Sequence, residues 1–143
     1  ECKKRVANIT PNKIDESNLL LPEELHNIKD ESLDLIYSYI VFQHFDSVET
    51  FNFYADIINK KLKKGGVFNI FYGLNAYNSE DYFLLPKEKL QARGSSLFIN
   101  PHYIEKTFNR FKVLDHNFAS KLPWLLPEEL PSNSQAYIIG KKS

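Results

Sequence analysis

This sequence of 143 residues has one cysteine and five glycines, and its histidines and cysteine are not spaced like metal ligands. Each of these features excludes a class of binding or catalytic site. The one cysteine cannot form an internal disulfide, which favours the cytoplasm. The four histidines and the cysteine lack the spacing of metal ligands, so we expect no metal site. All five glycines lie at Gly65 or later, and none forms a Gly-x-Gly or a Gly-x-Ser-x-Gly. The sequence therefore contains no Walker or dinucleotide-binding glycine loop and no hydrolase nucleophile elbow.

An excess of charge and a long hydrophobic run are missing as well. Eighteen acidic and eighteen basic residues give a formal net charge of zero. A protein that binds nucleic acid through its phosphates usually has a basic surplus, so we do not expect nucleic acid as a partner. No apolar run approaches the roughly 20 residues of a membrane helix. Residues 1–143 are long enough for a single domain with a buried core.

The stretch from Ser32 to Tyr72 predicts a strand, a helix and a second strand. It begins with a continuous apolar run of β-branched and aromatic residues, which is typical of a strand buried on both faces in the middle of a parallel sheet. The segment that follows has apolar residues at every third or fourth position, which predicts an amphipathic helix. This stripe consists of Val48, Phe51, Tyr54, Ala55, Ile58 and Leu62.

Signals for both ends of this helix are present. Asp46, with Glu49 three residues later, predicts an N-terminal capping box. Gly65 follows several lysines and predicts a left-handed residue that ends the helix. The second strand is then expected from Val67 onward. A strand, a helix and a strand in this order predict one βαβ unit with two parallel strands.

Three short motifs follow one another in this stretch: Leu-Asp-Leu-Ile at 33–36, Val-Phe-Gln-His at 41–44 and Leu-Lys-Lys-Gly-Gly at 62–66. Together they resemble the second half of a class I S-adenosylmethionine-dependent methyltransferase. Members of that family often carry a Phe/Leu-Asp-Leu-Ile/Val strand, a Phe-Gln-His or Leu-x-His turn, and a helix closed by Leu-Lys-x-Gly-Gly. Each motif alone is weak, and their order and separation carry the resemblance.

The resemblance implies an α/β, Rossmann-like fold. It implies a mostly parallel sheet with helices on both faces and a C-terminal antiparallel strand, with residues 1–143 forming the C-terminal part of a methyltransferase domain that lacks the N-terminal strands of the full fold. The implied cofactor is S-adenosyl-L-methionine. The family's Asp/Glu-x-Gly-x-Gly cofactor turn is not among these residues, so it is expected upstream of Glu1.

The rest of the chain predicts further elements of this fold. Pro22 suits the first position of a short helical turn, and Asn100 with Pro101 predicts the start of a helix that ends near Arg110. Residues 112–116 and 135–141 predict two closing strands, like the reversed hairpin at the end of the family's fold. The long segment from 73 to 94 is either a cover over the substrate or a tolerated surface excursion. His116 is interpreted as a packing residue.

The predicted site lies at the carboxyl ends of the strands, where ligands gather on open parallel sheets. His44 is the candidate proton acceptor and Tyr39 the candidate positioning group; the alternative is a structural turn histidine and a core tyrosine. The resemblance implies an acidic or polar adenine contact, for which Asp15 or its neighbour Glu16 is the candidate, unless this segment is only a solvated loop. The predicted cofactor residues are Asp15, Ser38 and Tyr39, and the predicted substrate residues are Gln43, Tyr72 and Asn75.

The resemblance implies methyl transfer by in-line attack of an oxygen, nitrogen or carbon nucleophile on the cofactor's sulfonium methyl. The Asn/Asp-Pro-Pro-Tyr signature of many DNA and protein amide methyltransferases is absent, which favours a small-molecule acceptor. The alternative is a non-catalytic binding or assembly module that retains the methyltransferase scaffold.

Overall fold

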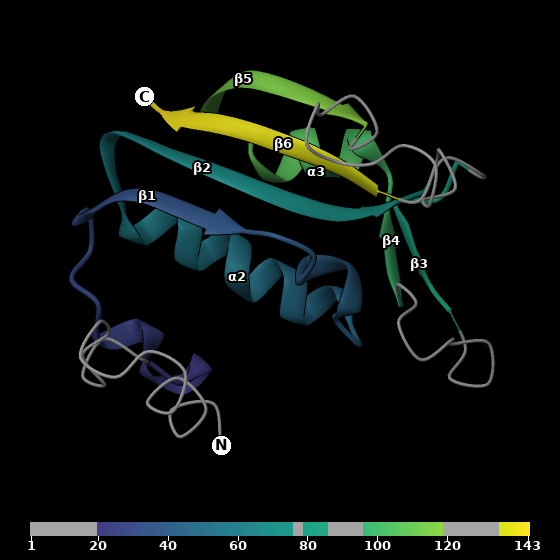
Figure 1. Cartoon of the computed structure of the whole chain (residues 1–143), viewed down its shortest axis with the longest axis horizontal. Coiled ribbons are helices and arrows are strands. Elements are labelled where there is room, and N and C mark those ends of the chain that lie inside the picture. Colours follow the sequence, from purple (N-terminus) through teal and green to yellow (C-terminus); the bar gives the residue numbers. More distant parts are fainter. Residues whose placement is uncertain (1–19, 76–78, 86–95, 119–134) are drawn as a thin grey trace, which may run out of the picture.

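The structure, a computed structural model, describes residues 20–75, 79–85, 96–118 and 135–143. These residues form a six-stranded sheet and two α-helices, with short 3₁₀ turns before and after the first strand (Figure 1). In chain order the elements are η2 (Pro22–Asn27), β1 (Leu33–Ser38), η3 (Phe42–His44), α2 (Val48–Lys61), β2 (Leu62–Leu74), β3 (Tyr82–Leu84), β4 (Leu97–Ile99), α3 (Pro101–Thr107), β5 (Phe111–Phe118) and β6 (Gln135–Lys142).

Strand β2 is the centre of the sheet. Along one edge it pairs antiparallel with β6, which pairs antiparallel with β5. Along the other edge it pairs in parallel first with β1 and then, near its end, with β4, and β3 pairs antiparallel with β4. The predicted βαβ unit and the final antiparallel strand are confirmed. The described sheet is mixed rather than mostly parallel, because the short β3 and both C-terminal strands run against their neighbours.

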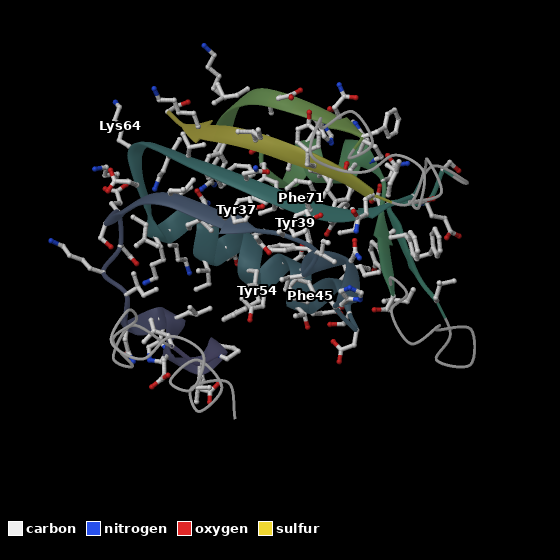
Figure 2. The ribbon with its side chains drawn as sticks, in the orientation of Figure 1. Tyr37, Tyr39, Phe45, Tyr54, Lys64 and Phe71 are labelled. Atoms are coloured by element: carbon white, nitrogen blue, oxygen red, sulfur yellow. The ribbon has the colours of Figure 1, made fainter. Side chains whose placement is uncertain are left out.

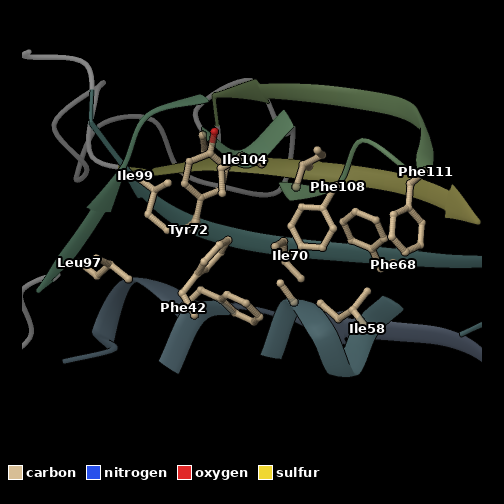
Figure 3. Close-up of a cluster of buried hydrophobic side chains, with 14 of the residues drawn as sticks. Phe42, Ile58, Phe68, Ile70, Tyr72, Leu97, Ile99, Ile104, Phe108 and Phe111 are labelled. Atoms are coloured by element: carbon tan, nitrogen blue, oxygen red, sulfur yellow. The ribbon is translucent and has the colours of Figure 1, made fainter. Parts of the chain in front are cut away.

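Both α-helices pack against the same face of the sheet. Side chains alternate along β2, so Phe68, Ile70 and Tyr72 point toward α2 and α3, whereas Phe71 points to the other side. We call these sides the helix face and the opposite face. The helix face carries the main core. Ile58 of α2, Ile104 of α3 and Phe108, the residue that follows α3, are all buried in it (Figure 3). The prediction of helices on both faces is therefore not met by the described residues, which place helices on one face only.

The start and end of α2 differ from the prediction. Ser47, not Asp46, is the N-cap, because its extended backbone lets Oγ accept a hydrogen bond of 3.1 Å from the Thr50 amide. The helix ends at Lys61, and β2 begins with the next residue. Gly65 has a φ of 80°, but it lies within an irregular part of the pairing between β1 and β2 instead of closing the helix. The predicted apolar stripe is confirmed from Val48 to Ile58, whereas Leu62, its last predicted member, is the first residue of β2.

Strand β1 is less buried than its apolar sequence predicts. Leu35 is 61% exposed and Tyr37 is 56% exposed. Among the described residues β1 pairs with β2 alone, and no described helix covers the opposite face, onto which these two side chains point. The prediction of a strand buried on both faces is therefore wrong for the part of the chain that the structure describes.

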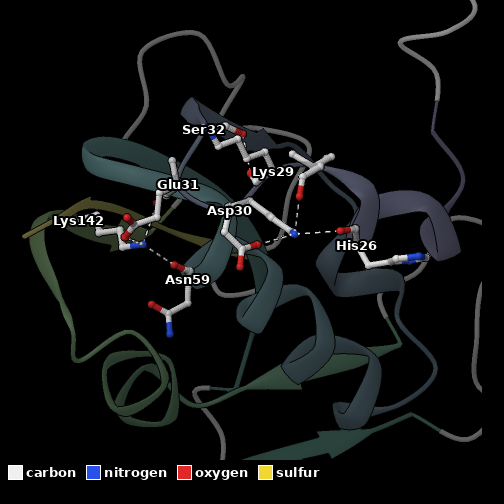
Figure 4. A network of polar contacts seen from close by, with 10 residues as sticks. His26, Lys29, Asp30, Glu31, Ser32, Asn59 and Lys142 are labelled. Carbon is white, nitrogen blue, oxygen red and sulfur yellow. Dashed lines mark hydrogen bonds and ion pairs between the residues drawn. The ribbon is translucent and has the colours of Figure 1, made fainter.

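Lys61, the last residue of α2, is hydrogen-bonded to the segment before β1, where Figure 4 labels His26 and Asp30. It is 5% exposed, and its ammonium donates to the carbonyl oxygens of His26 and Ile28 at 3.1 and 2.5 Å and to Asp30 at 2.6 Å. This ammonium lowers the pKa of Asp30, chiefly through the hydrogen bond. Lys142 of β6 also binds the C-terminal end of α2, because its ammonium donates to the backbone carbonyls of Asn59 and Leu62.

We expect Lys61→Met to lower the free energy of unfolding by about 2 kcal/mol, because it leaves two backbone carbonyls without their donor. Urea denaturation of residues 1–143 measures this change. Lys60→Met is the matched control: its side chain is exposed, so we expect a change within about 0.5 kcal/mol. Equal losses in the two variants would show that the buried ammonium contributes nothing specific.

Candidate functional site

A strained turn connects the carboxyl end of β1 to η3. Ile40 has a φ of 56°, a conformation that β-branched residues rarely adopt. The turn returns the chain so that Gln43 lies against Gly73 near the end of β2, where a Cβ on the glycine would be 3.4 Å from the Gln43 Cβ. That Cβ would also overlap the carbonyl oxygen of Leu97. Glycine at position 73 therefore lets β2, β4 and η3 meet at one point.

Gln43 is the middle of a hydrogen-bonded chain at this point. Gln135 donates through Nε2 to Gln43 Oε1, and Gln43 Nε2 lies 3.2 Å from His44 Nε2. An amide nitrogen can only donate, so His44 Nε2 accepts and the neutral ring carries its proton on Nδ1. Both glutamines are buried, and His44 is exposed. The chain thus runs from the interior to an imidazole at the surface.

The hydrogen bonds among Gln135, Gln43 and His44 can also be donated in the opposite direction. Gln135 Oε1 is buried and has no hydrogen-bond partner among the described residues. If His44 Nε2 becomes protonated it donates instead of accepting, and the Gln43 amide must turn to present Oε1 to the ring. Gln43 Nε2 then faces Gln135, whose Oε1 accepts once that amide turns as well. Two buried amides therefore support either protonation state of His44.

Aromatic residues border this chain on the opposite face of the sheet. Tyr39 contacts Phe71 edge-on, with ring centroids 4.9 Å apart, and Tyr37 lies 6.5 Å from the same ring (Figure 2). Tyr137 of β6 lies on the other side of Phe71 and donates to Asp115 at 2.6 Å. Burial and this hydrogen bond raise the pKa of Tyr137 to about 12, so it stays protonated at neutral pH. The side chains around Phe71 on the opposite face are therefore aromatic, with the carboxylate of Asp115 beside Tyr137.

The structure brings together three of the predicted site residues and separates the others. Tyr39 lies beside Phe71 and Gln43 lies beside Gly73, and these two residues of β2 are neighbours on the opposite face. His44 joins this group through its hydrogen bond with Gln43. Ser38 points to the helix face and lines an apolar pocket of about 270 Å³ between η2, β1 and α2, beside the stacked rings of Phe45 and Tyr54. Ser38 and Tyr39 thus lie on different faces.

Three further predicted residues do not join this cluster. Tyr72 points to the helix face, where its hydroxyl is 2.7 Å from His116 Nε2. Asn75 donates to the backbone carbonyl of Glu80 at 2.8 Å. Asp15 lies outside the described residues. The functional roles assigned to all these residues stay predictions.

Sequence reasoning missed Gln135 and the turn at Ile40. Gln135 opens β6 and reads as an ordinary polar strand residue, and only the register of β6 on β2 places it opposite Gly73. A positive φ at an isoleucine has no sequence signal. His116, interpreted as a packing residue, in fact binds both Tyr72 and Glu105.

The described ranges contain no group of three or more histidine, cysteine or acidic side chains arranged to hold a metal ion. In the same part of the chain no helix is both long enough and apolar enough to cross a membrane.

No protein-family model matches the sequence, and no curated protein is detectably related to it. Solved structures do match. A protein from Sulfolobus solfataricus described as a type 11 methyltransferase superimposes with a TM-score of 0.51 at 18% sequence identity. The match covers 98% of this chain and 64% of the Sulfolobus chain. An S-adenosylmethionine-dependent methyltransferase from Clostridium acetobutylicum also has a TM-score of 0.51, at 14% identity, covering 99% of this chain and 69% of its own.

These likenesses show that the chain has a methyltransferase-like α/β fold. The chain spans about two thirds of the length of the methyltransferases it matches. A further match, to the cytosine-N4-specific PvuII DNA methyltransferase, has a TM-score of 0.45, which is too low to inform the substrate.

Proposed function

We propose that the protein containing this chain transfers a methyl group from S-adenosylmethionine to a small molecule. The observation that supports this most directly is the Gln135–Gln43–His44 chain, which ends in an imidazole at the carboxyl edge of a methyltransferase-like sheet. The zero net charge and the absent Asn/Asp-Pro-Pro-Tyr signature favour a small acceptor over nucleic acid or a protein amide.

The described residues fit the acceptor side of such a reaction better than the cofactor side. Around the edge they offer an imidazole, two amides and tyrosine rings, but this group contains no carboxylate placed to hold ribose hydroxyls. Asp15, the candidate adenine contact, lies outside the described residues. When bound, the cofactor would supply an electrophilic methyl group.

The chain's own residues would then orient the acceptor and remove its proton. Tyr37 and Tyr39, which pack on the buried ring of Phe71, provide an exposed aromatic surface against which a small molecule can pack. His44 would take the proton of an acceptor hydroxyl or amine at Nε2, displacing the Gln43 donor, and the two turned amides would then stabilise the protonated ring. Alignment of the two reactants supplies the remainder of the rate enhancement.

Isothermal titration with S-adenosylmethionine tests the proposal. The protein is residues 1–143 together with any residues that its gene encodes ahead of Glu1, compared with residues 1–143 alone. We expect the longer protein to bind with a dissociation constant between about 1 μM and 1 mM, the usual range for enzyme substrates. ATP is the control ligand, since it shares the adenosine but lacks the sulfonium, and should give no heat. Absence of binding by both proteins would instead support a non-catalytic module.

A further inference from the structure

An apolar pocket of about 270 Å³ lies on the helix face between η2, β1 and α2. Leu33 and Ser38, the first and last residues of β1, both line it, so it runs along the strand. The facing wall comes from α2, where Tyr54, Ile57 and Ile58 lie on one side of the helix. The pocket is therefore an elongated space between a strand and the helix that follows it.

A small molecule can reach this pocket from solvent. Val41, which lines it just beyond β1, is 49% exposed, and Leu25 and Tyr54 are partly exposed. Phe45 stacks on Tyr54, with ring centroids 5.1 Å apart and nearly parallel planes (Figure 2). A molecule that enters therefore meets an aromatic wall that is itself accessible.

The lining of the pocket is uncharged. Among the described residues that form it there is no lysine, arginine, histidine, aspartate or glutamate. A charged group that entered the pocket would lose water without gaining a partner of opposite sign, which costs free energy. The pocket therefore suits a neutral molecule.

The pocket is separate from the His44 site. Ser38 lies opposite Ile70 in the strand register and points with it to the helix face. Gln43, which is hydrogen-bonded to His44, lies against Gly73 on the opposite face. A molecule in the pocket is thus on the other side of the sheet from the proposed methyl acceptor.

We propose that this pocket is a second binding site, which takes a neutral, flat molecule of two fused aromatic rings. The volume supports the size, because an apolar cavity of about 150 Å³ in another protein admits benzene and this pocket is clearly larger. Its course along β1 suits two rings side by side, and the stacked rings of Phe45 and Tyr54 suit a flat face. This inference does not depend on methyl transfer.

Titration of residues 1–143 with 2-naphthol, followed by amide chemical shifts in NMR spectra, tests the site. 2-Naphthoate is the charged probe of similar size, and phenol is the neutral probe with one ring. We expect the largest shifts in β1 and α2. We expect 2-naphthol to bind about tenfold more tightly than either probe, because 2-naphthoate would bury a charge and phenol buries less apolar area.

Two variants of α2 locate the binding. Tyr54→Ala removes one of the stacked rings and should weaken 2-naphthol binding about tenfold. Phe53→Ala is the matched control, because Phe53 is 46% exposed and does not line the pocket. We expect that variant to leave the affinity within about twofold. Alanine is the most favourable residue in helices, so α2 should form in both variants.

Several outcomes would overturn the proposal. They are equal affinity for 2-naphthol and 2-naphthoate, equal losses in the two variants, shifts that map to another part of the sheet, or no binding at all. Displacement of 2-naphthol by S-adenosylmethionine would assign the pocket to the cofactor instead. Binding that is lost when the residues encoded ahead of Glu1 are included would show that the protein's own chain fills the pocket. The comparison of the probes requires no variant, so the test stands even where a substitution impairs folding.

Discussion

His44→Ala is expected to lower the turnover number of the intact enzyme by about 100-fold or more when the acceptor is a hydroxyl or an amine. Removal of a positioned general base usually costs about 10² to 10⁴ in rate, and His44 is the imidazole at the end of the buried amide chain. Steady-state kinetics with saturating S-adenosylmethionine measures the change. His102→Ala is the matched control, because His102 is exposed on α3 and its substitution should leave turnover unchanged.

A second variant separates the base from its support. Gln43 has no role in this mechanism except through His44, so Gln43→Leu should slow turnover less than His44→Ala does. The double variant should then be no slower than His44→Ala alone, since residues that act as a unit are not additive. Turnover of His44→Ala within about threefold of the unmodified enzyme, which is less than 1 kcal/mol in the barrier, would remove the catalytic role.

Local signals in the sequence predicted the elements that depend on short-range patterns. The apolar stripe of α2, the Asn100 cap of α3 and the final strand are all found, because helix periodicity and capping are encoded within a few residues. The sequence does not distinguish between the two adjacent N-cap candidates of α2. Asp46 and Ser47 have similar capping propensities, and only the backbone conformation of Ser47 decides between them.

Features that depend on the sheet register could not be predicted in the same way. The meeting of Gln43 and Gln135 joins positions that are 92 residues apart, and it exists because β6 pairs with β2 so that Gln135 faces Gly73. The contact of Tyr72 with His116 likewise depends on the order β2, β6, β5. Alternation along β2 then sends Tyr72 to the helix face, whereas Gln43 of η3 lies against Gly73 on the opposite face, although the sequence grouped the two in one substrate site.

The burial of β1 shows where an apolar pattern and the described structure disagree. The run from Leu33 onward has the composition of a strand covered on both sides, yet Leu35 and Tyr37 are more than half exposed. An apolar pattern shows that a strand is suited to burial on both faces. It does not show whether the described residues supply the elements that would cover those faces. Leu35 and Tyr37 therefore leave apolar area uncovered on β1, whose second edge pairs with no described strand.

Gly73→Ala is expected to lower the free energy of unfolding by about 3 kcal/mol, a large part of the 5 to 15 kcal/mol typical of a domain. The added Cβ would overlap the carbonyl oxygen of Leu97, which belongs to the strand that pairs with Gly73 and cannot rotate away. Relief requires β4 to move from β2, and Gln43 loses its packing position at the same time. The midpoint and slope of urea denaturation measure the loss.

Gly65→Ala provides the matched comparison for the glycine substitution. Gly65 has a φ of 80°, so alanine there pays for a left-handed backbone, but its Cβ would meet nothing closer than 3.9 Å. We expect a loss of about 1 kcal/mol for this variant, since only conformational strain is involved. If Gly73→Ala cost no more than Gly65→Ala, β2 and β4 could separate without penalty. The close approach of β2, β4 and η3 would then not be what fixes Gln43 beside His44.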